Sequence, residues 1–229
     1  QLLQAHTLRT SGSSGVPFAV FRDDNYLKRD HAQCLRFYSN CLRTPLLESD
    51  WIYFIHHSGL LVSSMLGKYR IFQLPDLLPT TPLGQHLLLI KPRLLVVLPS
   101  YLPLLIAHKK EILDSGVEAV LVNSESSSCH ERAYYSKLLE LPIFDEYSSE
   151  EIGLMATQCL YSRYHFTEDS TYLEIINADE NGFGAVVATD LKNAYMPMIR
   201  FDHGDLAKLH DSPSICQCGR SSMSLSEIN

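Results

Sequence analysis

The sequence has no long uninterrupted hydrophobic run and no excess of positive charge. Its longest apolar stretch, residues 87–106, contains Lys91, Arg93 and three prolines, so no membrane span is expected. The 229 residues include 19 Lys and Arg against 26 Asp and Glu, a net charge of -7. Nucleic acid is therefore not an expected partner, and a phosphate-bearing substrate would need local cations or a metal ion.

Signals for export are also scarce. Residues 1–14 lack the apolar core of a signal peptide. The six cysteines are unevenly spaced, and 45% hydrophobic residues supply enough core without a disulfide framework. These features favour a soluble protein of one large or two small domains in the cytoplasm.

Short apolar runs alternate with helical periodicity in the first two thirds of the chain. Strands are predicted at 51–55, 93–98, 117–122 and 143–144, and helices at 26–42, from 59, from 101 to 112, and at 131–141. This alternation implies an α/β fold, with an open, mostly parallel sheet covered by helices on both faces. From about residue 153 the pattern predicts a smaller β-rich subdomain, with strands at 172–176 and 185–189 and an extended segment at 196–201. The predicted domains are 1–152 and 153–229.

A loop rich in glycine and hydroxyl groups occupies residues 10–17, Thr-Ser-Gly-Ser-Ser-Gly-Val-Pro. Glycine allows several N–H groups to turn toward one point, and hydroxyls add donors, as a polyphosphate requires. The same composition also suits a flexible linker or an expression remnant. The loop alone leaves both readings open.

Two other segments carry side chains that could also bind parts of a nucleotide. Residues 145–153 follow a predicted strand, where an aromatic ring could stack on a base and a carboxylate could hold Mg²⁺. A solvated acidic loop that caps a helix is the alternative. Residues 198–206 end in a predicted Gly204-Asp205 turn, whose carboxylate could accept both ribose hydroxyls, although Gly-Asp is also a common turn dipeptide.

A separate set of residues suits a metal. Three thiols and one imidazole, at Cys159, His165, Cys216 and Cys218, form a favourable set for tetrahedral zinc if two distant loops meet. Four protein ligands would make the site structural. Free cysteines beside a strand are the alternative, and Cys34, Cys41 and Cys129 read as ordinary thiols.

Four motifs in order, TSGSSGVP, DEYSSEE, MIRFDHGDL and CQCGR, resemble the adenylate-forming enzymes. The closest branch resembles the phenylacetate–coenzyme A ligase-like and capsule-biosynthesis proteins, and the resemblance runs from Arg9 to Arg220. It implies the fold of the N-terminal domain of these enzymes. It also implies ATP-dependent adenylation of a small carboxylic acid, followed by transfer to a thiol of coenzyme A or a carrier protein.

The resemblance assigns roles residue by residue. The residues expected to bind the nucleotide are Thr10, Ser11, Gly12, Ser13, Ser14 and Gly15 at the phosphates, Ser124, Glu125 and Tyr147 at adenine, and Asp205 at the ribose. Asn123 belongs with Ser124 and Glu125 to the segment that resembles the lining of the other face of adenine. Glu151 matches the Mg²⁺-binding catalytic glutamate, with Glu150 as a substitute. His57 and Tyr101 fall where the acid pocket is expected, which favours an apolar or aromatic acid.

The sequence departs from this family at three points. Val16 replaces the lysine usual before the loop proline, Asp202-His203 replaces basic and hydroxyl residues, and the mobile C-terminal lid with its lysine is expected to be absent. The alternatives are therefore a nucleotide- or acyl-binding module without turnover, or an acyl-protein synthetase. A homodimer is left open.

Overall fold

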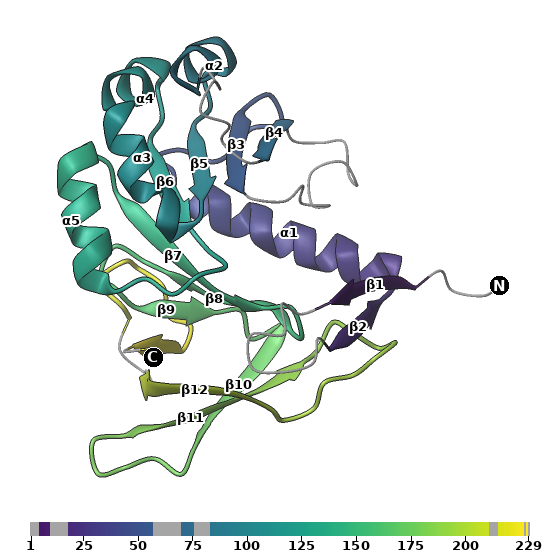
Figure 1. Ribbon diagram of the computed structural model, residues 1–229. Coiled ribbons are helices and arrows are strands. Elements are labelled where there is room, and N and C mark those ends of the chain that lie inside the picture. The colour runs from purple at the N-terminus through teal and green to yellow at the C-terminus, as the bar shows by residue number, and fades with distance from the viewer. Residues whose placement is uncertain are drawn as a thin grey trace. The chain divides into compact units, whose positions relative to one another are not determined.

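The computed structural model describes residues 5–9, 18–56, 70–75, 83–210, 215–226 and 228 (Figure 1). The chain forms two compact units. We call residues 34–145 the α/β unit and residues 1–33 with 146–229 the β-rich unit. The predicted functional division at residues 152 and 153 stays a prediction.

The α/β unit is built on a parallel sheet of strand order β4-β3-β5-β6-β7. Its strands are β3 (Trp51–His56), β4 (Arg70–Pro75), β5 (Leu94–Val97), β6 (Ala119–Val122) and the first three residues of β7 (Ile143–Ser149). Every residue of β5 and β6 is buried. Continuous apolar runs of this kind are typical of parallel strands that are covered on both faces.

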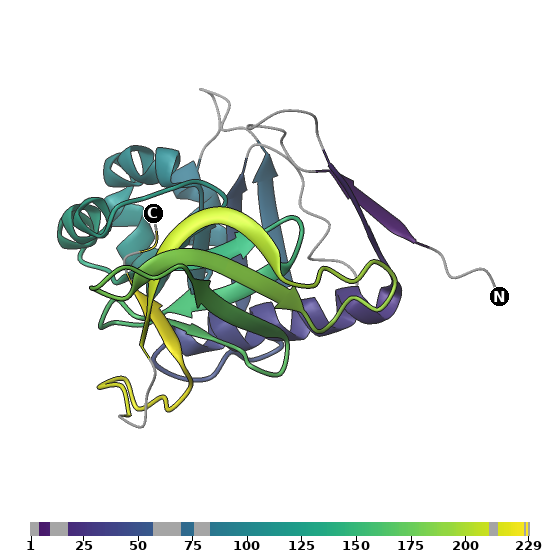
Figure 2. The same cartoon turned by 90° about the horizontal axis from the view of Figure 1, so that it is seen from below.

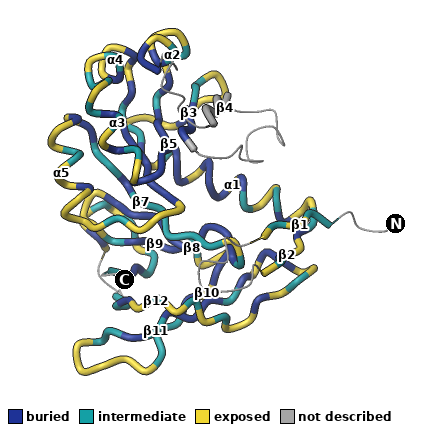
Figure 3. The backbone as a smooth tube through the Cα atoms, in the orientation of Figure 1, coloured by how far each residue is buried: buried dark blue, intermediate teal, exposed yellow. Residues whose placement is uncertain are grey.

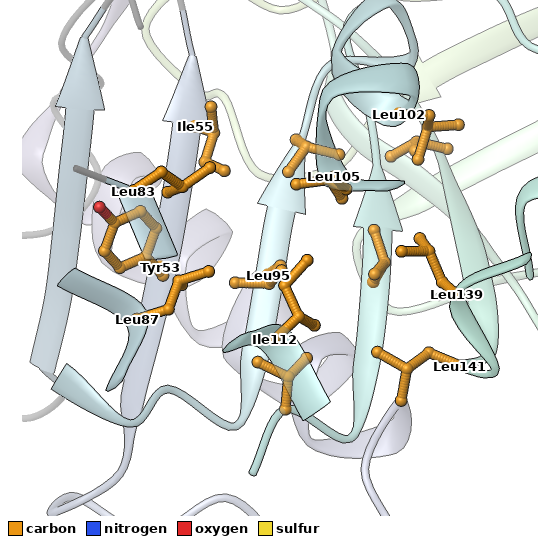
Figure 4. Packing of buried hydrophobic residues seen from close by; sticks show 14 residues of the cluster. Tyr53, Ile55, Leu83, Leu87, Leu95, Leu102, Leu105, Ile112, Leu139 and Leu141 are labelled. Atoms are coloured by element: carbon orange, nitrogen blue, oxygen red, sulfur yellow. The ribbon is translucent and has the colours of Figure 1, made fainter. Parts of the chain in front are cut away.

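Four helices and one 3₁₀ turn follow these strands. They are α2 (Leu83–Ile90), the 3₁₀ turn η1 (Pro99–Tyr101), α3 (Leu102–Ala107), α4 (Lys109–Ser115) and α5 (Cys129–Leu139). Leucines and isoleucines from these helices pack against the side chains of Tyr53, Ile55 and Leu95 on one face of the sheet (Figure 4). This cluster is the core of the α/β unit.

The opposite face of the same strands is covered by the last residues of α1 (Asp24–Asn40). Tyr38 of α1 meets Phe54 of β3 edge-on, with ring centroids 6.1 Å apart, and both side chains are buried. Cys34 and Cys41 are buried along the same segment and form no disulfide. The prediction of a parallel sheet with helices on both faces is confirmed.

Helix boundaries in this unit follow local chemistry. Gly116 ends α4 with φ +90°, a conformation that glycine adopts without strain. Ser128 caps α5, because its Oγ accepts from Glu131 N at 3.0 Å. The prediction of one helix up to Ile112 is wrong, since His108, with φ -115° and ψ 17°, leaves the helical region and separates α3 from α4.

The β-rich unit contains antiparallel pairs. The ladder runs β7-β8-β9-β13-β12-β11-β10, and β1 pairs with β2 separately. The strands are β1 (His6–Arg9), β2 (Ala19–Arg22), the end of β7, β8 (Gly153–Gln158), β9 (Tyr164–Phe166), β10 (Thr171–Ile176), β11 (Phe183–Asp190), β12 (Phe201–His210) and β13 (Ser224–Ser226). The long β11 and β12 run beside each other in Figure 2. Residues 177–181, between β10 and β11, are exposed (Figure 3).

Two strand predictions in this part of the chain need correction. The strand predicted at 143–144 continues to Ser149, because Glu146–Ser149 gain a second partner in β8. The extended segment predicted at 196–201 is not a strand before Phe201, and β12 continues through the turn that was predicted at Gly204. In the first case, pairing with the next strand along the chain extends β7, and in the second, pairing with β11 and β13 forms β12.

Among the residues that the structure describes, no helix combines the length and apolar character needed to cross a membrane.

An ion cluster connects the starts of three neighbouring strands in the α/β unit. Asp50, Arg93 and Glu118 each directly precede a strand, and β5 lies between β3 and β6. Arg93 contacts Asp50 Oδ2 at 2.5 Å and Glu118 Oε1 at 2.8 Å. The three side chains are only 16% to 21% exposed, so solvent screens these pairs less than surface ion pairs.

The two carboxyl groups of this cluster are held ionised. Burial alone would raise the pKa of Asp50 and of Glu118. Hydrogen bonds from Leu47 N and Arg43 N, together with Arg93, outweigh burial and keep each pKa below its ordinary value. This contribution to stability is therefore present at neutral pH and is lost as the pH falls through the lowered pKa values.

We expect Arg93→Ala to lower the free energy of unfolding by about 3 kcal/mol at pH 7, because two sheltered carboxylates lose their shared cation. The difference from wild type should begin to shrink below about pH 4, where the unfolded chain takes up protons, and should vanish as the pH falls through the lowered pKa values of the two carboxyls. Urea unfolding at several pH values measures it. Lys137→Ala, an exposed change in the same unit, is the control, and an Arg93→Ala difference that is independent of pH would contradict the ionic account.

Candidate functional site

Seven of the predicted site residues lie outside the described residues. They are Thr10, Ser11, Gly12, Ser13, Ser14, Gly15 and His57. Their roles stay predictions.

Tyr147 and Asp205, which are 58 residues apart, meet in the β-rich unit. The Tyr147 hydroxyl donates to Asp205 Oδ2 at 2.7 Å. A bulge in β12 makes the contact possible: Leu206 pairs with Ala185 and Asp202 with Val187, so three residues of β12 lie opposite one residue of β11. Gly204 sits in this bulge with φ +80°, where a side chain would be strained. The aspartate is therefore presented from a bulge, not from the predicted turn.

His203 lies beside this pair. Its ring meets the Tyr147 ring at 6.4 Å and the Phe201 ring at 5.1 Å between centroids. Burial lowers the pKa of His203, although the charges of Asp205 and Glu151 oppose the shift. Its Nε2 is buried and has no hydrogen-bond partner within the described part of the chain. A buried polar atom in this condition is what a missing ligand would leave behind.

The two neighbouring glutamates in the turn between β7 and β8 differ in their surroundings. Burial raises the pKa of Glu150, and Arg22 is the largest opposing influence. Glu151 instead acts electrostatically on His203, together with Asp205. The charge of Glu151 therefore acts on His203, beside the Tyr147–Asp205 pair, and it also raises the pKa of Glu150.

The predicted adenine-lining residues of the α/β unit follow β6. Asn123 is buried, and its Oδ1 has no hydrogen-bond partner among the residues described. Ser124 is exposed and adopts the left-handed conformation, with φ +65°. Both Glu125 carboxylate oxygens are engaged by Ser100, from its N at 3.0 Å and its Oγ at 3.1 Å. Glu125 thus connects the loops after β5 and β6, at the edge where open α/β sheets bind ligands.

Tyr101, predicted in the acid pocket, is half-buried in η1 and packs against the core cluster of the α/β unit. Its assignment to a pocket stays a prediction.

The four predicted metal ligands come together in the β-rich unit. The ligand atoms of Cys159, His165, Cys216 and Cys218 all lie within 4.8 Å of one another. Cys159 follows β8, and His165 lies in β9, which pairs with both β8 and β13. The cysteines at 216 and 218 precede β13. Strand pairing therefore gathers the four residues.

Two matching turns present the cysteines. In the first, Cys159 N donates to Arg163 O at 2.8 Å and Ser162 N donates to Cys159 O at 3.0 Å. In the second, Cys216 N donates to Arg220 O at 2.9 Å and Gly219 N donates to Cys216 O at 2.8 Å. The fourth residue of each turn has a positive φ, which is +58° for Ser162 and +86° for Gly219.

The spacing of these atoms suits zinc. Zn–S bonds of about 2.3 Å place tetrahedral sulfur ligands about 3.8 Å apart. The Sγ atoms of Cys159 and Cys216 are 3.9 Å apart, and Cys218 Sγ is 3.3 Å from His165 Nε2. His165 Nδ1 lies 3.4 Å from Ser222 O, an outer contact that leaves Nε2 for a metal.

The pKa values of the four residues shift in different directions. Burial lowers the pKa of His165, and Arg220 and Arg163 lower it further, which favours the neutral imidazole that binds a metal. Burial raises the pKa of the Cys218 thiol to about 11, so metal binding at this residue must displace a proton. Three thiolates around Zn²⁺ carry one net negative charge, which these two arginines can balance. The residues present therefore fit a structural zinc ion.

Solved structures share this fold. An open conformation of 2-hydroxyisobutyryl-CoA ligase, in complex with 2-HIB-AMP and CoA, matches with a TM-score of 0.76 and 19% identity over 96% of this chain and 51% of that chain. Apo MatB from Rhodopseudomonas palustris matches with a TM-score of 0.64 and 11% identity, over 96% of this chain and 46% of that chain. The Klebsiella oxytoca NpsA N-terminal subdomain, in complex with 3-hydroxyanthranilyl-AMSN, matches with a TM-score of 0.65 and 13% identity, over 96% of this chain and 61% of that chain.

The chain has the fold of the N-terminal domain of adenylate-forming enzymes. The fold class implied by the sequence motifs is thus confirmed. The chain spans about half the length of the first of these ligases, 51%. No known family model and no curated protein matches the sequence.

The neighbours that organise the candidate site were not predicted from the sequence. The sequence predicts His203 only as a departure from the family, and it predicts no role for Ser222, Arg163 or Arg220. A signal for the arginines does exist, because each follows the first cysteine of its turn by four residues.

We expect Tyr147→Phe to lower the free energy of unfolding by about 2 kcal/mol at pH 7, because a hydrogen bond to a carboxylate is lost. Burial, reinforced by the charge of Asp205 and the hydrogen bond to it, raises the pKa of Tyr147 above its ordinary 10.0. A raised folded-state pKa gives stability that is complete below pH 10 and is lost above it. Denaturant unfolding should therefore show the difference between wild type and variant shrinking above pH 10.

Tyr172→Phe, at an exposed tyrosine of the same unit, controls for the loss of a hydroxyl. Equal effects of the two variants would contradict the Tyr147–Asp205 contact.

Proposed function

We propose that this chain carries the nucleotide-binding core of an ATP-dependent acid–thiol ligase. The carboxylate of a small acid attacks the α-phosphate of ATP, which releases pyrophosphate and forms an acyl adenylate. The observation that supports this most is the Tyr147–Asp205 hydrogen bond, because it joins two of the four family motifs in one place. The similarity in fold to ligases crystallised with adenylates supports it as well.

In this proposal the nucleoside is held by the Tyr147–Asp205 pair. One oxygen of Asp205, Oδ2, accepts from the tyrosine, and Oδ1 remains to accept from ribose hydroxyls. The half-buried ring of Tyr147 offers a face for adenine. The roles of Ser124 and Glu125 at adenine stay predictions. The buried Nε2 of His203 would gain a partner from the bound nucleotide.

Glu151 is the residue proposed to hold Mg²⁺. The turn is partly exposed, and a carboxylate is a suitable ligand for a hard cation that also bridges phosphate oxygens. Magnesium would supply the positive charge that neutralises the reacting phosphates. The protein residues contribute position, which is the main requirement of this reaction class.

The acyl acceptor is proposed to be coenzyme A, since the 2-hydroxyisobutyryl-CoA ligase is crystallised with CoA. A carrier-protein thiol, or the thiol of another protein as in acyl-protein synthetases, is the alternative acceptor. Val16, which replaces a lysine usual in the phosphate loop, also supports a second candidate: a module that binds nucleotide or an acyl group without turnover.

The full-length protein should catalyse ATP–pyrophosphate exchange with at least one member of a panel of 2-hydroxy, aliphatic and aromatic acids. Glu151→Gln should lower the exchange rate about 100-fold, because a charge that stabilises the transition state is weakened. Radiolabelled pyrophosphate incorporation measures this. The preformed adenylate, offered coenzyme A or a carrier protein in turn, identifies the acceptor.

Two matched variants sharpen the exchange experiment. Glu180→Gln, on an exposed turn, should leave the rate unchanged. A larger loss in Glu150→Gln than in Glu151→Gln would reassign the metal ligand. ATP binding without exchange across the whole panel would favour the binding module over the enzyme.

We also propose that Cys159, His165, Cys216 and Cys218 hold a structural Zn²⁺. The distances among the four ligand atoms and the two matching turns support this. The ion would fix the segment before β13 to β8 and β9, and with four protein ligands it would leave no open position for substrate.

The purified protein should contain about one zinc ion per chain by elemental analysis. Cys216→Ser should lose most of that zinc and lower the melting temperature, because binding free energy at a structural site is folding free energy. Cys129→Ser, at an exposed cysteine of the other unit, should retain the zinc. Undegraded wild-type protein that lacks zinc would rule the site out.

A further inference from the structure

Side chains from β2 and α1 bind a row of carbonyl groups in the β-rich unit. Arg22 Nη2 donates to Glu150 O at 2.5 Å, and the Tyr26 hydroxyl donates to Ile152 O at 2.8 Å. Gln33 Nε2 donates to Leu154 O at 3.1 Å. The three acceptors are the carbonyls of alternate residues along the turn and the start of β8. We call Arg22, Tyr26 and Gln33 the carbonyl clamp.

The donors of the clamp are themselves held in place. The Arg22 guanidinium lies 4.4 Å from the centroid of the Tyr26 ring, and Lys192 Nζ lies 5.2 Å from it. Lys192, whose side chain is 2% exposed, also bonds Asp30 Oδ1 at 3.0 Å and Gln33 Oε1 at 3.1 Å. A buried lysine thus orients the third donor and fixes α1 by an ion pair.

Gly153 shows how closely the clamp approaches the turn. A Cβ at this position would lie 2.3 Å from the Tyr26 hydroxyl oxygen and 2.6 Å from Asp30 Oδ1. The residue also has φ +82°, which disfavours any side chain. Glycine at position 153 therefore leaves room for α1 to pack against the turn.

The clamp binds the residues immediately before and after Glu151 in the sequence. Its first acceptor, Glu150 O, belongs to the peptide group that enters Glu151, and its second, Ile152 O, belongs to the residue that follows Glu151. Ile152 N donates to Ser149 Oγ at 3.2 Å, which closes the same turn. With both flanking carbonyls held, the Glu151 backbone has little freedom to rotate, and the direction of its side chain is restricted.

We propose that Arg22 and Tyr26 are positioning residues for Glu151. They hold the turn so that the Glu151 carboxylate is oriented for a divalent cation before the nucleotide binds. This inference rests on the proposed role of Glu151 in ATP-dependent adenylation. Because β2 and α1 directly follow residues 10–17, the clamp also links the predicted phosphate loop to the cation site through a short stretch of chain.

The test compares Tyr26→Phe with wild type in the full-length protein. This change removes the hydroxyl that binds Ile152 O and keeps the ring. We expect amides 150–154 to exchange hydrogen about fivefold faster, and the Mg²⁺ concentration for half-maximal ATP binding, measured by calorimetry, to rise about fivefold, as expected for one lost hydrogen bond. At saturating Mg²⁺ the pyrophosphate exchange rate should return close to the wild-type value.

Leu173→Ala, a core change in the same unit, is the control for general destabilisation. It should lower stability without shifting the Mg²⁺ dependence. An equal Mg²⁺ shift in Leu173→Ala, or no shift and no faster exchange of amides in Tyr26→Phe, would overturn the clamp. If wild type exchanges pyrophosphate and Glu151→Gln does not, such a result rejects the clamp alone. If wild type fails to bind Mg²⁺ and ATP, the proposed function and the clamp fail together.

Discussion

The close approach of α1 to the start of β8 is the constraint on which the β-rich unit depends. A side chain at Gly153 would collide with Tyr26 and Asp30, so glycine at this point allows donors on α1 to reach backbone carbonyls. Those carbonyls belong to a turn and a strand end, where the ladder leaves groups without partners. Their satisfaction by buried side chains fixes α1, and with it the chain that follows the glycine-rich segment.

Backbone irregularities, more than regular strands, place the functional groups. The bulge at Gly204 brings Asp205 to Tyr147, and two turns with positive φ at the fourth residue present the cysteines. Regular strand pairing then supplies the long-range order, since β9 connects β8 to β13. The sheet gathers segments that are far apart in sequence, and the irregular positions aim their side chains.

The parallel sheet and the identity of the motif residues were predictable from the sequence, because both depend on local information. β5 and β6 are continuous apolar runs, and the motifs occur in family order. The course of β7 beyond Phe144 and the bulge at Asp205 were not predictable, since each depends on the register of pairing with a neighbouring strand, which composition does not reveal. The four candidate metal ligands were proposed from chemistry alone, whereas the matching turns that position them depend on hydrogen bonds that composition does not reveal.

Charge is the remaining difficulty for a polyphosphate ligand in the β-rich unit. Asp202, Asp205 and Glu151 all act on His203, so the surroundings of the Tyr147–Asp205 pair are strongly negative. The nearby cations Arg22 and Lys192 are engaged with carbonyls, Asp30 and the Tyr26 ring. Val16 adds no charge to the glycine-rich segment. In the proposed reaction, nucleotide binding in this unit therefore depends on a divalent cation, and rigid presentation of Glu151 matters more here than in a site rich in lysine.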